Sequence, residues 1–254
     1  MYGKEEQQRR GGFVSVRSLL RLVIMTNISK QLDAVHVRIQ AACVAAGRPA
    51  GSVALLAVSK TFGVHAVQSA FASGQTDFGE NYIQEAVEKI TSLRHLPLVW
   101  HCIGPVQSNK TRLVAGHFDW VQTVDRFKIA QRLSEQRPAT LAPLQVCIQV
   151  NVDGGPTKSG VLPEDALALA QAVAGLPRLR LRGLMCIPEP VPDFAAACHV
   201  FKRASDLLTV LNAQGLDLDT LSMGMSADLE AAVASGSTLV RVGSAIFGMR
   251  QKNA

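Results

Sequence analysis

The sequence has few of the features that mark a disulfide, metal or membrane protein. Its five cysteines are odd in number, far apart and mostly in apolar runs, and none has the Cys-x-x-Cys or Cys/His spacing of a metal site. This pattern predicts reduced cysteines in the core of a cytoplasmic protein. A transmembrane segment is not indicated either, because the early apolar run 22–25 is short and follows Arg21.

The sequence also lacks a concentrated block of one charge. The formal net charge is +6, but residues 1–24 hold five Lys/Arg and two Glu and so account for +3 of it. The remaining charge is spread thinly, and aromatic residues make up only 5% of the chain. Nucleic-acid binding needs a basic patch, commonly interleaved with aromatics. The composition therefore predicts no nucleic-acid partner and no membrane partner.

No Pro/Gly-rich linker divides the chain, and 254 residues with 48% hydrophobic content can bury one large core. We expect a single domain over residues 25–250. Residues 1–24 are expected to be a disordered or misassigned extension, with Met25 as the natural start. An Arg-rich presequence is the alternative, against which Glu5 and Glu6 argue.

Short β-like runs alternate with helical segments along the whole chain. Helices are expected at 27–46, 64–73, 82–94, 107–115, 126–137, 163–174, 194–214 and 227–235. Strands are expected at 53–58, 76–79, 98–103, 120–124, 144–150, 179–187, 220–223 and 238–246. Alternation of this kind implies parallel pairing, and eight units close most simply into a (β/α)8 TIM barrel. A doubly wound open sheet is the alternative.

Active sites of such barrels lie at the carboxyl ends of the strands. Lys60 ends the first strand, in the run Leu-Leu-Ala-Val-Ser-Lys-Thr, and Asn81 follows the second. Ser226 follows the seventh, and Gly243 and Ser244 end the eighth. A lysine at the end of an apolar strand either reaches solvent or serves chemistry, so its neighbours must decide between the two.

The chemistry of these neighbours suits an anion. Ser226 is expected where a helix begins, either as a plain N-cap or as part of a phosphate site. Gly243 would let the backbone approach a ligand closely, and Ser244 adds a hydroxyl donor. Arg241 shares the inward side with Leu239 and Gly243, where it either forms a structural ion pair or contacts a ligand. His101 is expected to be a core residue rather than a catalytic one.

Six motifs in order, from Met25 to Gly248, resemble the pyridoxal phosphate homeostasis proteins, also called proline synthetase co-transcribed homologues. The motifs are LLAVSKT, FGENYIQE, WHCIGPVQSNK, TKSG, LRLRGLMCIP and LSMGMSADLEAAVASGSTLVRVGSAIFG. That family is similar in fold to the N-terminal barrel of alanine racemase, a fold type III pyridoxal 5′-phosphate (PLP) protein. The resemblance therefore implies the same barrel and the cofactor PLP.

The resemblance also implies roles for individual residues. Lys60 matches the lysine that holds PLP as a Schiff base, and Arg241 matches the arginine facing the pyridine nitrogen. Ser226, Gly243 and Ser244 match phosphate-binding positions. Asn81 is similar to a pocket residue.

The motif after Lys60 departs from the family. Many relatives have a second lysine where this chain has Phe62. Lys158 is either a substitute neighbour of the pocket or a solvated loop residue.

The function implied is PLP binding and intracellular vitamin B6 homeostasis, without robust catalysis. Arg241 would hold the pyridine nitrogen unprotonated and weaken the electron sink. The racemase's second base is a tyrosine from another domain, whereas this sequence has only Tyr2 and Tyr82 and ends soon after Gly248. The expected partners are PLP and apo-enzymes that receive it, and the expected state is a monomer. The alternatives are an amino-acid racemase and a cofactor-free Schiff-base aldolase.

Overall fold

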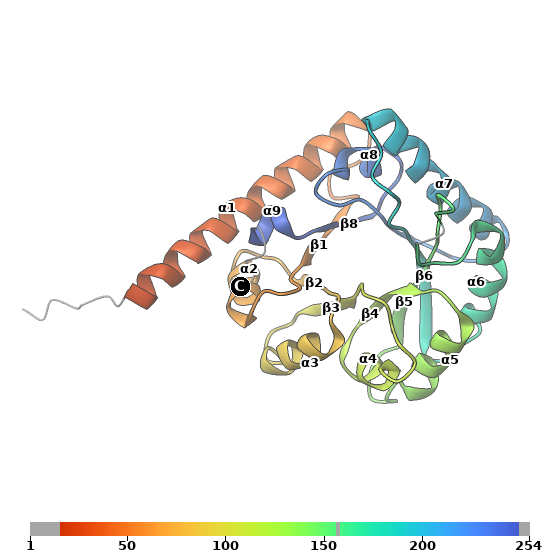
Figure 1. Ribbon diagram of the computed structural model, residues 1–254, viewed down its shortest axis with the longest axis horizontal. Coiled ribbons are helices and arrows are strands. Elements are labelled where there is room, and N and C mark those ends of the chain that lie inside the picture. Colours follow the sequence, from red (N-terminus) through yellow and green to blue (C-terminus); the bar gives the residue numbers. More distant parts are fainter. Residues whose placement is uncertain (1–15, 156–157, 249–254) are drawn as a thin grey trace, which may run out of the picture.

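Eight parallel strands form a closed barrel in the computed structural model, which describes residues 16–155 and 158–248 (Figure 1). Each strand pairs with the next along the chain, and β8 pairs with β1. The strands are β1 Ala54–Val58, β2 Asp77–Glu80, β3 Val99–Cys102, β4 Trp120–Val124, β5 Leu144–Gln149, β6 Leu179–Met185, β7 Thr220–Ser222 and β8 Leu239–Val242. The predicted (β/α)8 TIM barrel is confirmed, and the open-sheet alternative is wrong.

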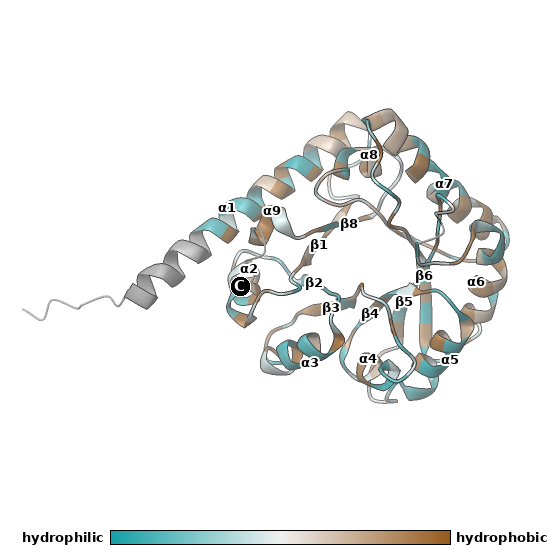
Figure 2. Ribbon diagram, viewed as in Figure 1, coloured by the Kyte–Doolittle hydropathy of each residue, from teal (hydrophilic) through white to brown (hydrophobic). Residues whose placement is uncertain are grey.

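Helices surround the barrel on its outer side (Figure 1). They are α1 Val16–Ala45, α2 Val64–Ala72, α3 Ile83–Ser92, α4 Thr111–His117, α5 Phe127–Gln136, α6 Ala166–Ala174, α7 Phe194–Ala213, α8 Leu229–Ala234 and α9 Ser244–Phe247, with a short 3-10 turn η1 Pro163–Asp165 before α6. Apolar and polar residues mix along most of these helices, as expected when one side faces the strands (Figure 2).

The first helix begins at Val16 rather than 27, and two predicted boundaries next to the strands are also wrong, each by four residues. The eighth strand ends at Val242 rather than 246, and the chain turns at Gly243 into helix α9. Helix α4 begins at Thr111 rather than 107, because residues 107–110 form a turn closed by a hydrogen bond from Lys110 N to Gln107 O. Both differences lie at the carboxyl ends of strands, where the chain leaves the regular ladder.

The barrel has an apolar outer layer and a partly polar interior. Strands β1 to β8 pack against the helices through one continuous core. Inside the barrel a small apolar cluster consists of Leu56, Val58, Ile103 and Leu239. Buried polar side chains share this interior, including Arg241, whose strand position pairs with Leu56. A polar interior is costly unless it is hydrogen-bonded, so its partners are central to the site.

Helix α1 packs against the helices that flank the pairing of β1 with β8. Ile28, Leu32, Val35 and Ile39 recur every three or four residues and are buried. The helix contacts α2, α8 and α9, beside which it runs in Figure 1. Of the expected extension, residues 1–15 lie outside the described residues, while the α1 backbone starts at Val16. The proposed boundary at residue 25 stays a prediction.

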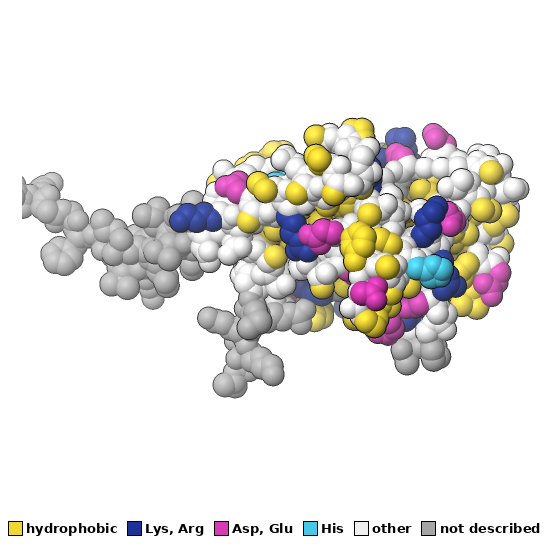
Figure 3. Space-filling view, turned by 90° about the horizontal axis from the view of Figure 1, so that it is seen from above, with side chains coloured by type: hydrophobic (Ala, Val, Ile, Leu, Met, Phe, Trp, Pro, Cys, Tyr) yellow, Lys and Arg dark blue, Asp and Glu magenta, His cyan; other side chains and the backbone are white. Residues whose placement is uncertain are grey.

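The surface shows no segregation of charge on the face drawn in Figure 3. There, the described Lys/Arg and Asp/Glu side chains are interspersed. All five cysteines are free thiols, and four of them are buried. Of the helices in the described ranges, none has both the length and the apolar character that a membrane crossing needs. Those ranges also hold no group of His, Cys, Asp and Glu suited to a metal ion.

Candidate functional site

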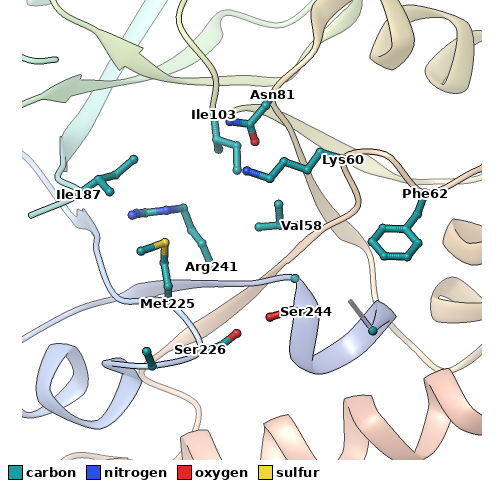
Figure 4. Close-up of a pocket in the computed structure, with 13 residues that line it drawn as sticks. Val58, Lys60, Phe62, Asn81, Ile103, Ile187, Met225, Ser226, Arg241 and Ser244 are labelled. Atoms are coloured by element: carbon teal, nitrogen blue, oxygen red, sulfur yellow. The ribbon is translucent and has the colours of Figure 1, made fainter. Parts of the chain in front are cut away.

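A cavity of about 360 Å³ opens at the carboxyl ends of the barrel strands. Its size is within the usual range for a small-molecule site. The lining residues are Val58, Lys60, Phe62, Asn81, Ile103, Ile187, Met225, Ser226, Ala227, Arg241, Gly243, Ser244 and Gly248. All six residues singled out in the sequence therefore line one cavity, although they come from four separate segments of the chain (Figure 4).

Lys60 sits in the turn that leaves β1 and is half-buried. Figure 4 shows its side chain extending into the cavity toward Ile103. The next residue, Thr61, has φ of 69°, a left-handed conformation that is strained for a β-branched residue. Its backbone N–H donates to Glu85 Oε1 at 2.9 Å. This contact from helix α3 holds the chain in the turn that aims Lys60.

A buried ionic cluster fixes the other side of the Lys60 turn. Ser59, the preceding residue, donates its hydroxyl to Glu80 Oε1 at 2.6 Å. Lys89 Nζ donates to the same oxygen at 2.6 Å and to the carbonyl of Ser59 at 3.0 Å. Both Glu80 and Lys89 are almost wholly excluded from solvent. Burial raises the pKa of Glu80 above its usual range even beside the Lys89 ammonium.

Arg241 enters the cavity from β8 and is 4% exposed. It donates to Ser222 Oγ at 2.7 Å and to the carbonyl of Cys186 at 2.9 Å. Among the described residues, no carboxylate forms an ion pair with it. Burial lowers the pKa of Arg241. Of the two expectations for this arginine, the structural ion pair is therefore wrong within the described chain.

Ser226 and Ser244 lie on the side of the cavity away from Asn81 in Figure 4. Ser244 begins helix α9. Ser226 does not begin a helix as predicted. It lies in a turn, and α8 starts after Asp228, whose Oδ1 accepts the N–H of Met225 at 2.6 Å. The carboxylate closes the turn and delays the helix, so Ser226 is left facing the cavity.

Gly243 allows β8 to lie close to β1 at the cavity. A Cβ at this position would be 3.1 Å from the carbonyl oxygen of Val58 and 3.3 Å from the Cβ of that residue. Such contacts are tighter than side chains normally make, so glycine permits the close packing of β8 on β1 at this point. Close approach of the Gly243 backbone to a ligand stays a prediction.

Asn81 follows β2 and has an unusual polar atom. Its Oδ1 is buried and accepts no hydrogen bond from the described residues. A buried amide oxygen without a donor is costly unless a ligand supplies one. Phe62 lies in the cavity wall, and its ring packs against that of Phe247 of α9 with centroids 5.2 Å apart and planes tilted by 31°, so an aromatic contact anchors the turn after Lys60.

Lys158 does not line this cavity and pairs with Glu189 at 3.0 Å. His101 is a satisfied core residue, as predicted: it is 2% exposed and stacks on Trp120. The sequence reasoning missed the apolar wall of the cavity, formed by Val58, Ile103, Ile187 and Met225. Three of these could have been found, because Val58, Ile103 and Ile187 end expected strands at the same mouth.

Comparison with known proteins shows the family to which the chain belongs. The family described as "Alanine racemase, N-terminal domain" matches residues 31–251. The pyridoxal phosphate homeostasis protein of Pseudomonas aeruginosa is 59% identical over 230 residues, 91% of this chain and 99% of that protein.

Solved structures give the same relationship. PipY of Synechococcus elongatus, solved with PLP bound, is 36% identical with a TM-score of 0.76, covering 87% of this chain and all of PipY. Alanine racemase of Clostridium difficile is only 14% identical, with a TM-score of 0.64 over 90% of this chain and 58% of the racemase. That likeness shows a shared fold alone. The chain belongs to the pyridoxal phosphate homeostasis protein family, whose barrel is that of the alanine racemase N-terminal domain.

Proposed function

We propose that this chain binds PLP through a Schiff base on Lys60 and acts in vitamin B6 homeostasis as a carrier rather than as a robust catalyst. The observation that carries the proposal is the convergence of one lysine, one buried arginine and two serines on a single cavity. Its closest support outside the chain is the family relationship and the PLP-bound structure of PipY.

The donor set fits the parts of PLP. Lys60 supplies the amine that condenses with the aldehyde, with loss of water. Ser226 and Ser244 supply hydroxyl donors for the phosphate, beside the close backbone at Gly243. Arg241 supplies only N–H donors, so it suits an unprotonated ring nitrogen. PLP, when bound, supplies an electron sink, and an unprotonated nitrogen makes that sink weaker.

Among the described lining residues, the cavity offers no second group for proton transfer. Lys60 and Arg241 are the only titratable side chains among its described lining residues. Arginine does not act as a base at neutral pH. Tyr82 is half-exposed on the surface and is not part of the lining, while Tyr2 lies outside the described residues. We therefore do not favour the racemase alternative, because two-sided proton transfer needs a base opposite Lys60.

A carrier that holds an aldehyde reversibly limits the free concentration of that aldehyde. In the cytoplasm, where the five free thiols would stay reduced, such a protein could pass PLP to apo-enzymes. We propose apo PLP enzymes as its partners and a monomer as its working state.

The test is an absorbance spectrum of the purified chain with PLP, followed by borohydride reduction and peptide mass mapping. We expect a visible absorbance band that borohydride removes, and a reduced adduct on Lys60. Lys60→Ala should lose both signals, whereas the control Lys158→Ala should keep both, because Lys158 pairs with Glu189 away from the cavity. An adduct mapped to Lys158 in the wild-type chain would overturn the assignment.

The carrier role and the absence of catalysis need separate measurements. PLP-loaded protein should activate an apo-enzyme that has a known PLP requirement, and Lys60→Ala should not. Added alanine should perturb the spectrum without appreciable racemisation. Steady turnover near the enzyme median of about 10 per second, lost in Lys60→Ala, would contradict the proposal in favour of a racemase.

A further inference from the structure

A continuous line of hydrogen bonds crosses the barrel interior from Arg241. Ser222 Oγ, which accepts from Arg241, donates to Gln122 Oε1 at 2.7 Å. Gln122 Nε2 lies 3.0 Å from His101 Nδ1, and His101 Nε2 lies 3.2 Å from Asp77 Oδ1. The line begins at the cavity and ends at Asp77, the first residue of β2, at the opposite end of that strand from Asn81.

The direction of every proton in this line is forced by its two ends. Arg241 can only donate, so Ser222 must use its single proton on the Gln122 carbonyl oxygen. The Gln122 amide nitrogen then donates to His101 Nδ1, which must carry no proton. The proton of the neutral His101 ring therefore lies on Nε2 and is donated to the Asp77 carboxylate.

Burial favours this one arrangement of protons over the alternatives. Ser222 and Gln122 are completely buried, and His101 is 2% exposed. The His101 ring also stacks on Trp120, with centroids 5.1 Å apart, so it cannot turn over freely. Burial lowers the pKa of His101, which agrees with a neutral ring. Reversing any one member would place two donors or two acceptors face to face in a medium where unpaired polar groups are costly.

We propose that Gln122 and His101 are positioning residues, which hold the Arg241 guanidinium through Ser222 and connect it to Asp77 as its distant counter-charge. No carboxylate among the described residues pairs directly with Arg241, whose other acceptor there is the Cys186 carbonyl. Without the line, Ser222 loses the acceptor that orients its hydroxyl. The guanidinium then keeps one fixed partner where it had two.

The first measurement uses the unliganded protein and does not depend on PLP. Nitrogen-15 NMR of the wild-type His101 ring should show Nε2 protonated and Nδ1 unprotonated. Gln122→Met, which keeps the side-chain volume and removes both hydrogen-bonding groups, should shift the guanidinium signals of Arg241 and speed the exchange of its protons. Gln149→Met is the matched control, because Gln149 is also a buried barrel glutamine but donates to Ser159 O outside the line.

The second measurement rests on the proposed function. If Arg241 faces the ring nitrogen, wild-type protein should prefer PLP to 1-deaza-PLP, which lacks that nitrogen. Gln122→Met should reduce this preference by roughly two- to tenfold, the effect of one net hydrogen bond. In a double-mutant cycle, Gln122→Met should have little further effect once Ser222→Ala has cut the line, because the two changes act through one path.

The outcomes separate the two proposals. A wild-type His101 with its proton on Nδ1 would overturn the positioning role whatever the ligand, and this reading needs no variant to fold. Unchanged Arg241 signals and an unchanged PLP preference in Gln122→Met would overturn it as well. If the chain bound no PLP but the NMR results were as expected, the proposed function would fail while the positioning role stood.

Discussion

Lys89 of helix α3 donates to the backbone carbonyl of Ser59, the residue immediately before Lys60, at 3.0 Å. The same ammonium pairs with the buried Glu80 carboxylate and, at 3.2 Å, with Glu85. Glu85 in turn accepts the N–H of Thr61, the residue immediately after Lys60. One ionic cluster on the outer side of the barrel therefore holds the residues on both sides of Lys60, Ser59 and Thr61, through hydrogen bonds to their backbone.

Lys89→Met should destabilise the protein by about 3–5 kcal/mol, because it leaves the Glu80 carboxylate buried beside Ser59 alone. Urea unfolding of the unliganded protein measures this. The control Lys202→Met removes an exposed lysine that pairs with Asp206 on α7, and should cost about 0–1 kcal/mol. Equal losses in the two variants would show that the buried cluster has no special importance.

Ser226→Ala and Ser244→Ala should each weaken PLP binding by roughly 1.5–3 kcal/mol, the value of a hydrogen bond to a charged group. Binding of pyridoxal, which has no phosphate, should change little. Titration by absorbance or calorimetry gives both affinities, with Ser205→Ala on α7 as a control outside the cavity. If pyridoxal and PLP were weakened equally, the phosphate would lie elsewhere.

Asp77 should contribute to acid sensitivity. Burial acts to raise the pKa of Asp77, but hydrogen bonds from His101 and Thr76 outweigh it, so the folded pKa lies below the usual value. The unfolded pKa of an aspartate is about 4. Above that pH Asp77 contributes its full stabilisation to the fold, and the contribution is lost as the pH falls through the lower folded pKa. The Asp77→Asn variant should therefore be less stable than the wild type at neutral pH. Its stability should also fall less than that of the wild type on acidification.

Urea midpoints at pH values from about 7 to about 3 measure this difference. Asp206→Asn on α7 is the comparison, since Asp206 pairs only at the surface with Lys202. If the urea midpoints of the wild type and of Asp77→Asn fell by the same amount as the pH was lowered, the contribution of Asp77 to acid sensitivity would be contradicted.

A chain beginning at Met25 should keep its melting temperature and its PLP affinity. The described buried positions of α1 start at Ile28, and residues 1–24 lie before the first motif that resembles the family. Thermal unfolding and a PLP titration of the two chain lengths make the comparison. A marked loss of either property would show that the earlier residues support the barrel.

Local pattern was enough to predict the barrel and the cavity. Most strands are short, largely buried runs that a polar or glycine residue ends or follows, and parallel closure brings those ends together. Lys60 and Arg241 could therefore be placed at one mouth before any contact was known. The residue pattern indicated an anion site, and the resemblance identified the ligand as PLP.

The supporting contacts could not be predicted, because they join residues whose proximity depends on packing. Lys89 meets Ser59 only through the angle of α3 against the barrel, and Gln122 meets Ser222 across 100 residues of sequence. Ser226 was misplaced for a related reason: Asp228, two residues later, closes the turn and sets the start of α8.

The pairing of β1 with β8 has a consequence for the growing chain. Ala54 and Ala57 of β1 lie beside Leu239 and Val242, 185 positions later in sequence. Contacts this distant form late and slowly, since most of the polypeptide must be ordered before they can close. During synthesis Lys60 emerges long before Ser226, Arg241 and Ser244. A ribosome-bound fragment therefore carries the reactive amine without its cavity, and competence for a phosphate ligand should arise only when the eighth strand is released.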